Sequence, residues 1–349
     1  MDAVPTLSPR QLNRTVLTRQ LLLQRSRGSL PQVLEATAGI QAQYAPSMYI
    51  GLWSRVEGFE RDHLNSALVD RSVVQGTLMR ATIHLVSKDD YWPFELAVRA
   101  PRRAWWLRSQ RAGVAVADLQ QAAAVVRTEL QNGPVSHAEL AARVGPASLM
   151  ALHVFTDLVR VPPSGTWERR RANIYAAAED WVGPEPELDA GDAVDHMVRR
   201  YLSAFGPARP KDIAAWAGLP LTEIRASLRR IEIHPFRSDE GDDLVDLVDL
   251  VIAAAETPAP VRFLPTWDTT LLAHARRAGV LLEEDRGRIF HVKNPQSEAT
   301  FLVDGVVGGT WRHDGERVTY ETFRPLDKRA RIEVEEEAAR LGGLFDDAR

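Results

Sequence analysis

The paired amides of Gln41 and Gln43 are the side chains whose type and spacing best suit chemistry. They flank one alanine in the segment GIQAQYAPSMYIGLWSR, and Tyr44 and Pro46 follow directly. Where the backbone is extended or turning, two side chains two residues apart can face the same cleft. The oxygen of an amide accepts a hydrogen bond from water, and its NH₂ group donates to a phosphate, a sugar or a base, but an amide is no strong base. The alternative is that both are ordinary polar residues at a helix end.

The sequence lacks the common signatures of nucleotide-binding, metal-dependent and serine-nucleophile enzymes. It has no GxGxxG, no Walker A loop, no HExxH pair and no GxSxG elbow. Its 9 histidines are spread singly, without the spacing of metal ligands. A cysteine count of 0 excludes disulfides, thiol nucleophiles and cysteine zinc sites. We therefore expect neither a metal nor another cofactor.

Length and composition indicate a globular protein of two to four domains. The chain has 349 residues, of which 45% are hydrophobic and 26% charged. The first residues lack the apolar core of a signal peptide, and no apolar run is long enough to cross a bilayer. We expect a cytoplasmic protein without membrane contact, and a monomer.

The charge is unevenly distributed along the chain. The net charge is −4, but residues 1–110 hold 14 basic and 9 acidic side chains, whereas residues 183–260 hold 8 basic and 15 acidic ones. Nearly all the basic side chains are arginine, which suits bidentate contacts with phosphate. Arginine also accumulates in proteins of GC-rich genomes, so its abundance alone does not establish a nucleic-acid binder.

Three stretches that would position these residues share an order of helices followed by paired strands, as in a winged helix. We expect unit 1 over residues 1–112, unit 2 over 113–184 and unit 3 over 185–257. In unit 1 we expect a helix N-capped by Ser8 over Pro9–Leu23, helices over Pro31–Gln41 and Leu64–Asp70, and strands over Val73–Met79 and Ala81–Val86.

Units 2 and 3 share a local pattern. The stretches NGPVSHAELAARVG and FGPARPKDIAAWAGLP both contain a Gly-Pro break, a polar cap and a short helix. In unit 2 the expected elements are helices over Leu119–Leu130 and Ala138–Val144, a recognition helix over Leu149–Leu158, and wing strands over Val159–Pro162 and Asn173–Ala177. The tip of that wing carries Arg169, Arg170 and Arg171. In unit 3, Thr222 is expected to cap the last helix, and the wing over His234–Val251 is acidic.

The sequence pattern changes in residues 258–349, from mainly helical to mainly strand-like. Short strand-like runs alternate with turns such as Asp304-Gly305 and Asp314-Gly315, and a final helix is expected over Lys328–Leu341. This pattern predicts a small antiparallel β-sheet or barrel. The expected fold class is therefore mainly α with β-wings: tandem winged-helix domains followed by a small C-terminal antiparallel β-barrel.

Several segments together resemble one known family. The QAQ segment resembles the paired-glutamine motif of the AlkZ-like, YcaQ-related winged-helix DNA glycosylases. The segments RATIHLVSKDDYWPF, FGPARPKDIAAWAGL, RFLPTWDTTLLAHARR and FLVDGVVGGTWR resemble further family segments, and they occur in the right order from about residue 8 to 325. Where members often carry Tyr-Leu-Leu-Gly-Tyr-Arg, this chain has the six residues from Thr270 to Ala275.

The resemblance implies an enzyme that works on double-stranded DNA carrying alkylated bases. The implied reaction is metal-independent, monofunctional hydrolysis of the N-glycosidic bond of N7-alkylguanine, extending to bulky adducts or interstrand crosslinks. The implied role is DNA repair or self-resistance to a genotoxic metabolite. An N7-alkylated base already carries a positive charge and leaves without protonation, so that two neutral amides that position water are enough.

The resemblance also assigns roles to residues. It makes Gln41 and Gln43 catalytic, and it places Tyr44, His84, Asp268 and Arg312 in the active-site channel. The arginines of the basic segments are expected to bind DNA: Arg80, Arg102, Arg103, Arg169, Arg170 and Arg171.

Two alternatives come from other classes of protein. A non-catalytic winged-helix DNA-binding protein or transcriptional regulator would bind a defined operator, usually as a dimer, and would have no use for Gln-x-Gln. A protein-interaction scaffold would show no salt-dependent affinity for DNA.

Overall fold

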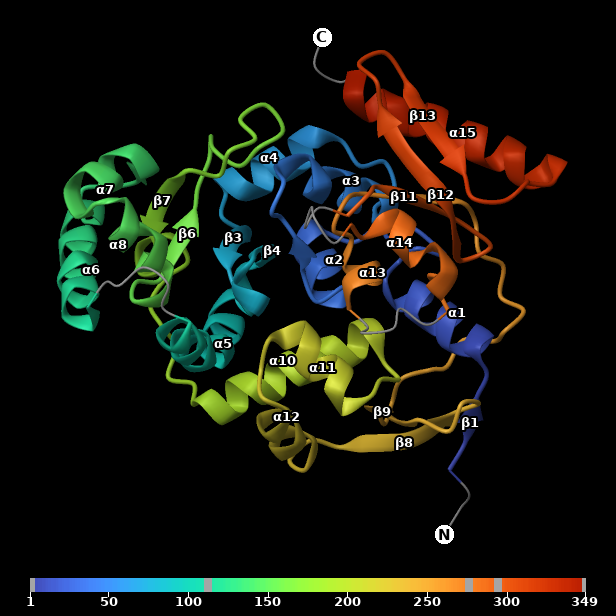
Figure 1. Ribbon diagram of the computed structural model, residues 1–349, viewed down its shortest axis with the longest axis horizontal. Helices are drawn as coiled ribbons and strands as arrows, with labels where there is room; N and C mark the ends of the chain where they lie inside the picture. Colours follow the sequence, from blue (N-terminus) through green and yellow to red (C-terminus); the bar gives the residue numbers. More distant parts are fainter. Residues whose placement is uncertain (1–3, 110–114, 274–278, 292–296, 347–349) are drawn as a thin grey trace.

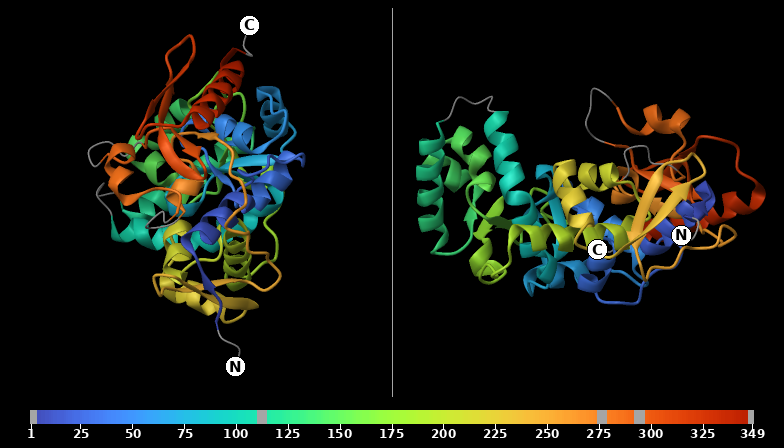
Figure 2. Two further views of the ribbon diagram at one scale, coloured as in Figure 1. Left: turned by 90° about the vertical axis from the view of Figure 1, so that its right-hand side faces the viewer. Right: turned by 90° about the horizontal axis from the view of Figure 1, so that it is seen from below.

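The computed structural model describes residues 4–109, 115–273, 279–291 and 297–346. In these residues the strands form three sheets, one of which joins the first two predicted units. Figures 1 and 2 show an elongated molecule in which α6, α7 and α8 lie at one end and β12, β13 and α15 at the other. His274 and Ala275, the last two of the six residues in which this chain differs from the family segment Tyr-Leu-Leu-Gly-Tyr-Arg, lie outside the described residues. The boundary predicted between units 1 and 2 also lies outside them.

Residues 4–109 contain the predicted helices and hairpin in the predicted order, together with further elements. Ser8 caps the first helix, since its hydroxyl accepts from the Gln11 N–H and the Gln11 side chain accepts from the Ser8 N–H. The elements are β1 (Thr6–Leu7), α1 (Pro9–Arg19), α2 (Leu30–Ala36), β2 (Ile40–Gln41), α3 (Ala45–Arg55), α4 (Arg61–Val69), β3 (Val73–Thr77), the 3-10 turn η1 (Met79–Ala81), β4 (Ile83–Ser87) and α5 (Lys88–Arg108).

The helix predicted up to Gln41 ends five residues earlier, at Ala36. The backbone then adopts positive φ at Ala38 (57°) and Gly39 (78°), which a helix cannot contain. A Cβ on Gly39 would lie 2.9 Å from Cγ1 of Val86, so the close approach of the chain to β4 requires glycine. The chain emerges extended, and Gln41 pairs with His84 across β2 and β4.

Residues 115–181 form the second set of elements. They are α6 (Val116–Leu130), β5 (Val135–Ser136), α7 (His137–Val144), α8 (Pro146–Ala151), the 3-10 turn η2 (Leu152–Val154), β6 (Leu158–Arg160), β7 (Ile174–Ala177) and α9 (Ala178–Trp181). The recognition helix predicted up to Leu158 is wrong at its C-terminal end. Leu158 belongs to β6, which pairs with β7 and with β3, giving the sheet order β2-β4-β3-β6-β7-β5.

Residues 189–247 form the third set, again helices followed by an antiparallel pair. The elements are α10 (Ala190–Phe205), α11 (Pro210–Ala217), α12 (Leu221–Leu228), β8 (Ile233–Ser238) and β9 (Asp243–Leu247). The predicted cap at Thr222 is wrong, because Thr222 already lies inside α12, which begins at Leu221 with Pro220 as its N-cap. Strand β1 joins β8 in parallel, and α10 packs along α5 in the largest core cluster. The winged-helix assignment of the three units stays a prediction.

The C-terminal part packs a sheet against α3. Its elements are β10 (Arg262–Leu264), α13 (Thr269–Leu272), the 3-10 turn η3 (Glu283–Asp285), α14 (Arg286–Ile289), β11 (Thr300–Val303), β12 (Val306–His313), β13 (Val318–Thr322) and α15 (Lys328–Asp346). Over the described residues the sheet is antiparallel and open, in the order β10-β11-β12-β13, so of the two predicted forms the sheet is present and the closed barrel is not. No helix among the described residues combines the length and the apolar character needed to cross a membrane.

Candidate active site

Gln41 and Gln43 lie side by side against the β3–β4 hairpin. Gln41 is buried in β2, whereas Gln43 is exposed just beyond it. The Gln41 Oε1 accepts from a guanidinium N–H of Arg80 at 3.3 Å, and the Gln43 Oε1 accepts from the backbone N–H of Ile83 at 3.2 Å. Both partners can only donate, which fixes the amide oxygens on the protein side. In the described part of the chain neither Nε2 donates a hydrogen bond.

His84, opposite Gln41, is fully buried. Its Nδ1–H donates to the carbonyl of Thr82 at 3.0 Å, and its Nε2 has no partner among the described residues. Burial, and then the positive charge of Arg80, lower the pKa of His84 from 6.5 to about 3. The ring is therefore neutral at neutral pH and cannot act as a general acid there.

Arg80 lies beside Gln41. It occupies the η1 turn with φ 54°, and its guanidinium donates to the Trp216 carbonyl as well as to Gln41. Burial lowers its pKa from 12.5 to about 10, so the group remains charged at neutral pH. A cavity of about 810 Å³ adjoins Arg80 between α5 and the α11–α12 corner, and its walls are largely apolar.

The loop between β6 and β7 folds back onto the Gln-x-Gln segment. Arg170 donates to the Tyr44 hydroxyl at 3.0 Å, and the three consecutive arginines 169–171 are exposed. Two anchors hold the loop: Gln75 donates to the Gly165 carbonyl at 2.9 Å, and buried Trp167 packs edge-on against Tyr49 at 5.6 Å between ring centroids. The exposed arginines are thus held next to the residue that follows Gln43.

Arg102 and Arg103 differ from the expectation of two exposed phosphate ligands. Arg102 is buried, and its guanidinium forms two hydrogen bonds with Glu95, so its described contacts lie within the protein and its contact with DNA stays a prediction. Arg103 is half-buried, with its guanidinium 4.4 Å from the Phe155 ring centroid. Arg103 stays a predicted DNA ligand.

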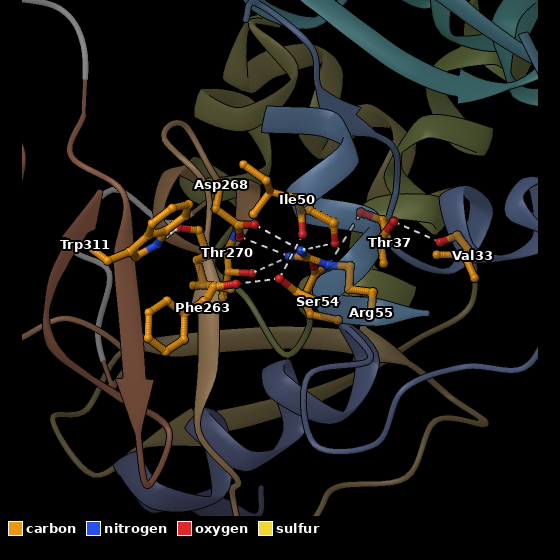
Figure 3. A network of polar contacts seen from close by, with 12 residues as sticks. Val33, Thr37, Ile50, Ser54, Arg55, Phe263, Asp268, Thr270 and Trp311 are labelled. Carbon is orange, nitrogen blue, oxygen red and sulfur yellow. Dashed lines mark hydrogen bonds and ion pairs between the residues drawn. The ribbon is translucent and has the colours of Figure 1, made fainter. Parts of the chain in front are cut away.

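Asp268 is buried and paired, which does not fit a place in an open channel. Both its oxygens accept from Arg55 at 3.0 Å, and Arg55 also donates to the Thr270 hydroxyl (Figure 3). Asp268 also caps α13 by accepting from the Thr270 N–H. Arg55 was not predicted from the sequence. The available signal is an arginine at the end of the mostly apolar stretch APSMYIGLWSR, which forms the fully buried helix α3, because a buried arginine requires an acidic partner.

Arg312 lies on another surface. It is exposed on β12, and it lines a separate cavity of about 400 Å³ with residues of β13 and its neighbours. Gln41 thus contacts Arg80 and pairs with His84, Gln43 is bonded to Ile83 beside His84, and Tyr44 is bonded to Arg170. The described contacts of Asp268 and Arg312 lie elsewhere. Over the described residues, three or more His, Asp or Glu side chains nowhere come together to hold a metal ion.

A protein-family model described as "DNA glycosylase AlkZ-like" matches residues 34–344. The chain belongs to the AlkZ-like DNA glycosylase family. The family expected from the sequence is thereby confirmed, and the reading as a non-catalytic regulator loses its support. As an AlkZ-like DNA glycosylase, the protein is a hydrolase that acts on DNA.

Individual AlkZ-like relatives match over nearly the whole chain. An interstrand DNA cross-link repair glycosylase of Streptomyces sahachiroi is 24% identical over 365 residues, covering 95% of each protein. The solved structure of the Streptomyces sahachiroi DNA glycosylase AlkZ superposes with a TM-score of 0.85 at 20% sequence identity, covering 99% of this chain and 98% of that one. The latter similarity shows that the two proteins share a fold.

Proposed function

We propose that the protein hydrolyses the N-glycosidic bond of N7-alkylated guanine in double-stranded DNA, with Gln41 and Gln43 as its catalytic residues. One observation carries the proposal. Two amides lie next to each other on extended chain, with both oxygens held by the β3–β4 hairpin and both NH₂ groups without a protein partner in the described structure. Such fixed polar groups are what a reaction with a developing charge requires.

The bond changes need no protein acid. The electron pair of the C1′–N9 bond moves to N9, where it cancels the positive charge of the alkylated base, and the base leaves neutral. The oxygen of water bonds to C1′ and releases a proton to solvent. This agrees with the structure: the His84 ring opposite Gln41 is neutral at neutral pH, and the carboxylate of Asp268, whose contacts lie elsewhere, is paired with Arg55.

The two amides would hold the attacking water. Each Oε1 accepts one hydrogen bond from the protein and has a second lone pair that can accept from water. Each free Nε2 can donate to the sugar, the phosphate or the base. Because neutral amides contribute little acid or base strength, only a weakened bond is cleaved, and undamaged purines resist.

DNA is proposed to be held beside this site by the exposed arginines 169–171. The contact of Arg170 with Tyr44 supports the proposal, because it places the loop next to Gln43. Arginine fits phosphate oxygens bidentately, and such contacts set affinity and register without reading sequence. The relative that acts in interstrand cross-link repair supports extending the substrates to bulky adducts and crosslinks.

The test is release of N7-methylguanine from duplex DNA, followed by chromatography and measured both without and with EDTA. We expect release by the wild-type protein at an unchanged rate in EDTA, and none from undamaged DNA. Gln131→Ala, which changes an exposed glutamine at the end of α6, is the control variant and should behave as wild type. Loss of all release in EDTA would contradict the metal-independent mechanism, and release of undamaged guanine would contradict the dependence on a charged base.

A further inference from the structure

Arg80, which the sequence predicts as a DNA ligand, makes its described contacts within the protein. Its guanidinium lies between the Gln41 Oε1 at 3.3 Å and the carbonyl of Trp216 in the last turn of α11. In the part of the chain that the structure describes, it forms no ion pair with an acidic side chain. The cation is instead balanced by carbonyl dipoles, because the last carbonyls of a helix lack intrahelical partners and carry partial negative charge.

We propose that Arg80 is a positioning residue, which fixes the amide of Gln41 with its oxygen toward the protein and its NH₂ group free for substrate. The inference rests on the proposed catalytic role of Gln41. A guanidinium only donates, so it accepts Gln41 in one orientation of the amide. The flipped amide would set its NH₂ group against the N–H groups of Arg80, donor against donor.

The backbone holds Arg80 in this place. Arg80 and Ala81 both have positive φ, 54° and 56°, which residues with a side chain rarely adopt. Gly218, at the end of α11, packs closely against the turn: a Cβ there would lie 3.0 Å from the backbone nitrogen of Arg80, so glycine makes this close approach possible. Non-glycine residues in this conformation persist where the surroundings impose it, and they cluster at functional sites.

The geometry therefore connects the third helical segment to the site. Through Arg80, the Trp216 carbonyl at the end of α11 sets the orientation of the Gln41 amide on β2, 175 residues earlier in the sequence. Gln43 is oriented independently by the backbone N–H of Ile83, so the effect is confined to Gln41. An amide fixed before substrate binds needs no reorganisation during the reaction.

The experiment is a double-mutant cycle of Arg80→Met and Gln41→Ala, measured as the single-turnover rate of N7-methylguanine excision at saturating enzyme. We expect Arg80→Met to reduce the rate about 10- to 100-fold, as is usual when a group that orients a functional side chain is removed. In the Gln41→Ala background, the same change should have an effect of less than about twofold. Arg80→Lys, which keeps a cation but not the bridging guanidinium, should recover part of the rate.

Binding separates this role from that of a phosphate ligand. We expect Arg80→Met to leave the salt dependence of DNA affinity unchanged, whereas losing one phosphate contact would lower the slope of log K against log salt by about 0.9. Arg317→Met, at an exposed arginine in the turn between β12 and β13, is the control for losing a positive charge. If Arg80→Met unfolds the protein, Arg80→Lys replaces it in the double-mutant cycle with Gln41→Ala.

The outcomes are distinct. A normal rate for Arg80→Met, a lowered salt slope, or an undiminished loss in the Gln41→Ala background would each overturn the positioning role while leaving the proposed function in place. A normal rate for Gln41→Ala alone would instead overturn the proposed function.

Discussion

Replacing Asp268 by asparagine distinguishes a structural carboxylate from a catalytic one. The carboxylate and Arg55 form a pair in which the side chains are 1% and 0% exposed, and Arg55 also donates to the Gly51 carbonyl and the Thr270 hydroxyl. Asparagine preserves the shape but leaves the charge of Arg55 buried without a counterion. Removing one partner of a buried pair costs about 3–5 kcal/mol, so we expect a loss of that order in the free energy of unfolding.

The assay is urea denaturation followed by circular dichroism, with single-turnover excision measured on the folded variant. Glu333→Gln, in the exposed pair with Arg329 on α15, is the control and should change the free energy of unfolding by less than about 0.5 kcal/mol. We expect Asp268→Asn to be strongly destabilised yet to excise within about tenfold of wild type once folded. An unchanged stability combined with a hundredfold slower excision would refute the reasoning and return Asp268 to the active site.

Three further predictions concern charge and pH. Replacing the arginines at 169–171 together should lower the slope of log K against log salt by about 2.7, measured by fluorescence anisotropy, and an unchanged slope would remove the loop from the interface. Excision should be flat between pH 6 and 8, because the pKa values of His84 and Arg80, about 3 and about 10, both lie outside that range, and a bell-shaped profile would contradict this. The pKa of His84 is lower in the folded state, so the unfolded state binds the proton first. The free energy of unfolding should therefore fall as the pH drops from about 6.5 toward 3, by at most about 1.4 kcal/mol per pH unit from this group, and His84→Asn should show a weaker dependence in denaturation at pH 7 and 5.

Local signals made part of this structure predictable. The N-cap at Ser8, the β3–β4 hairpin, the paired strands β6 and β7, and the order of helices before strands follow from local sequence patterns. The two-residue spacing of Gln41 and Gln43 was enough to suggest a shared cleft.

Long-range contacts account for what the sequence did not reveal. Leu158 suits a helix by its neighbours, but pairing with β7 makes it a strand. The sequence predicts Arg80 and Arg102 as DNA ligands and Asp268 as a channel residue, but it does not reveal their partners within the protein. The partners of Arg80 and Asp268 lie on segments far away in the chain. Arg102 shows the same at shorter range, because Glu95 lies two helical turns earlier on α5. The sequence around one residue does not indicate which distant residue it will contact in the fold.

The central claim is that Gln41 and Gln43 act together on one water, and single-turnover excision of N7-methylguanine beside a DNA-binding titration tests it most directly. We predict that Gln41→Ala and Gln43→Ala each slow excision by about 10²–10³-fold, as expected for losing one preorganised polar contact at a charged transition state. DNA affinity should change little, and the double variant should lose less than the product of the two single losses. Near-normal excision by both single variants would contradict the claim.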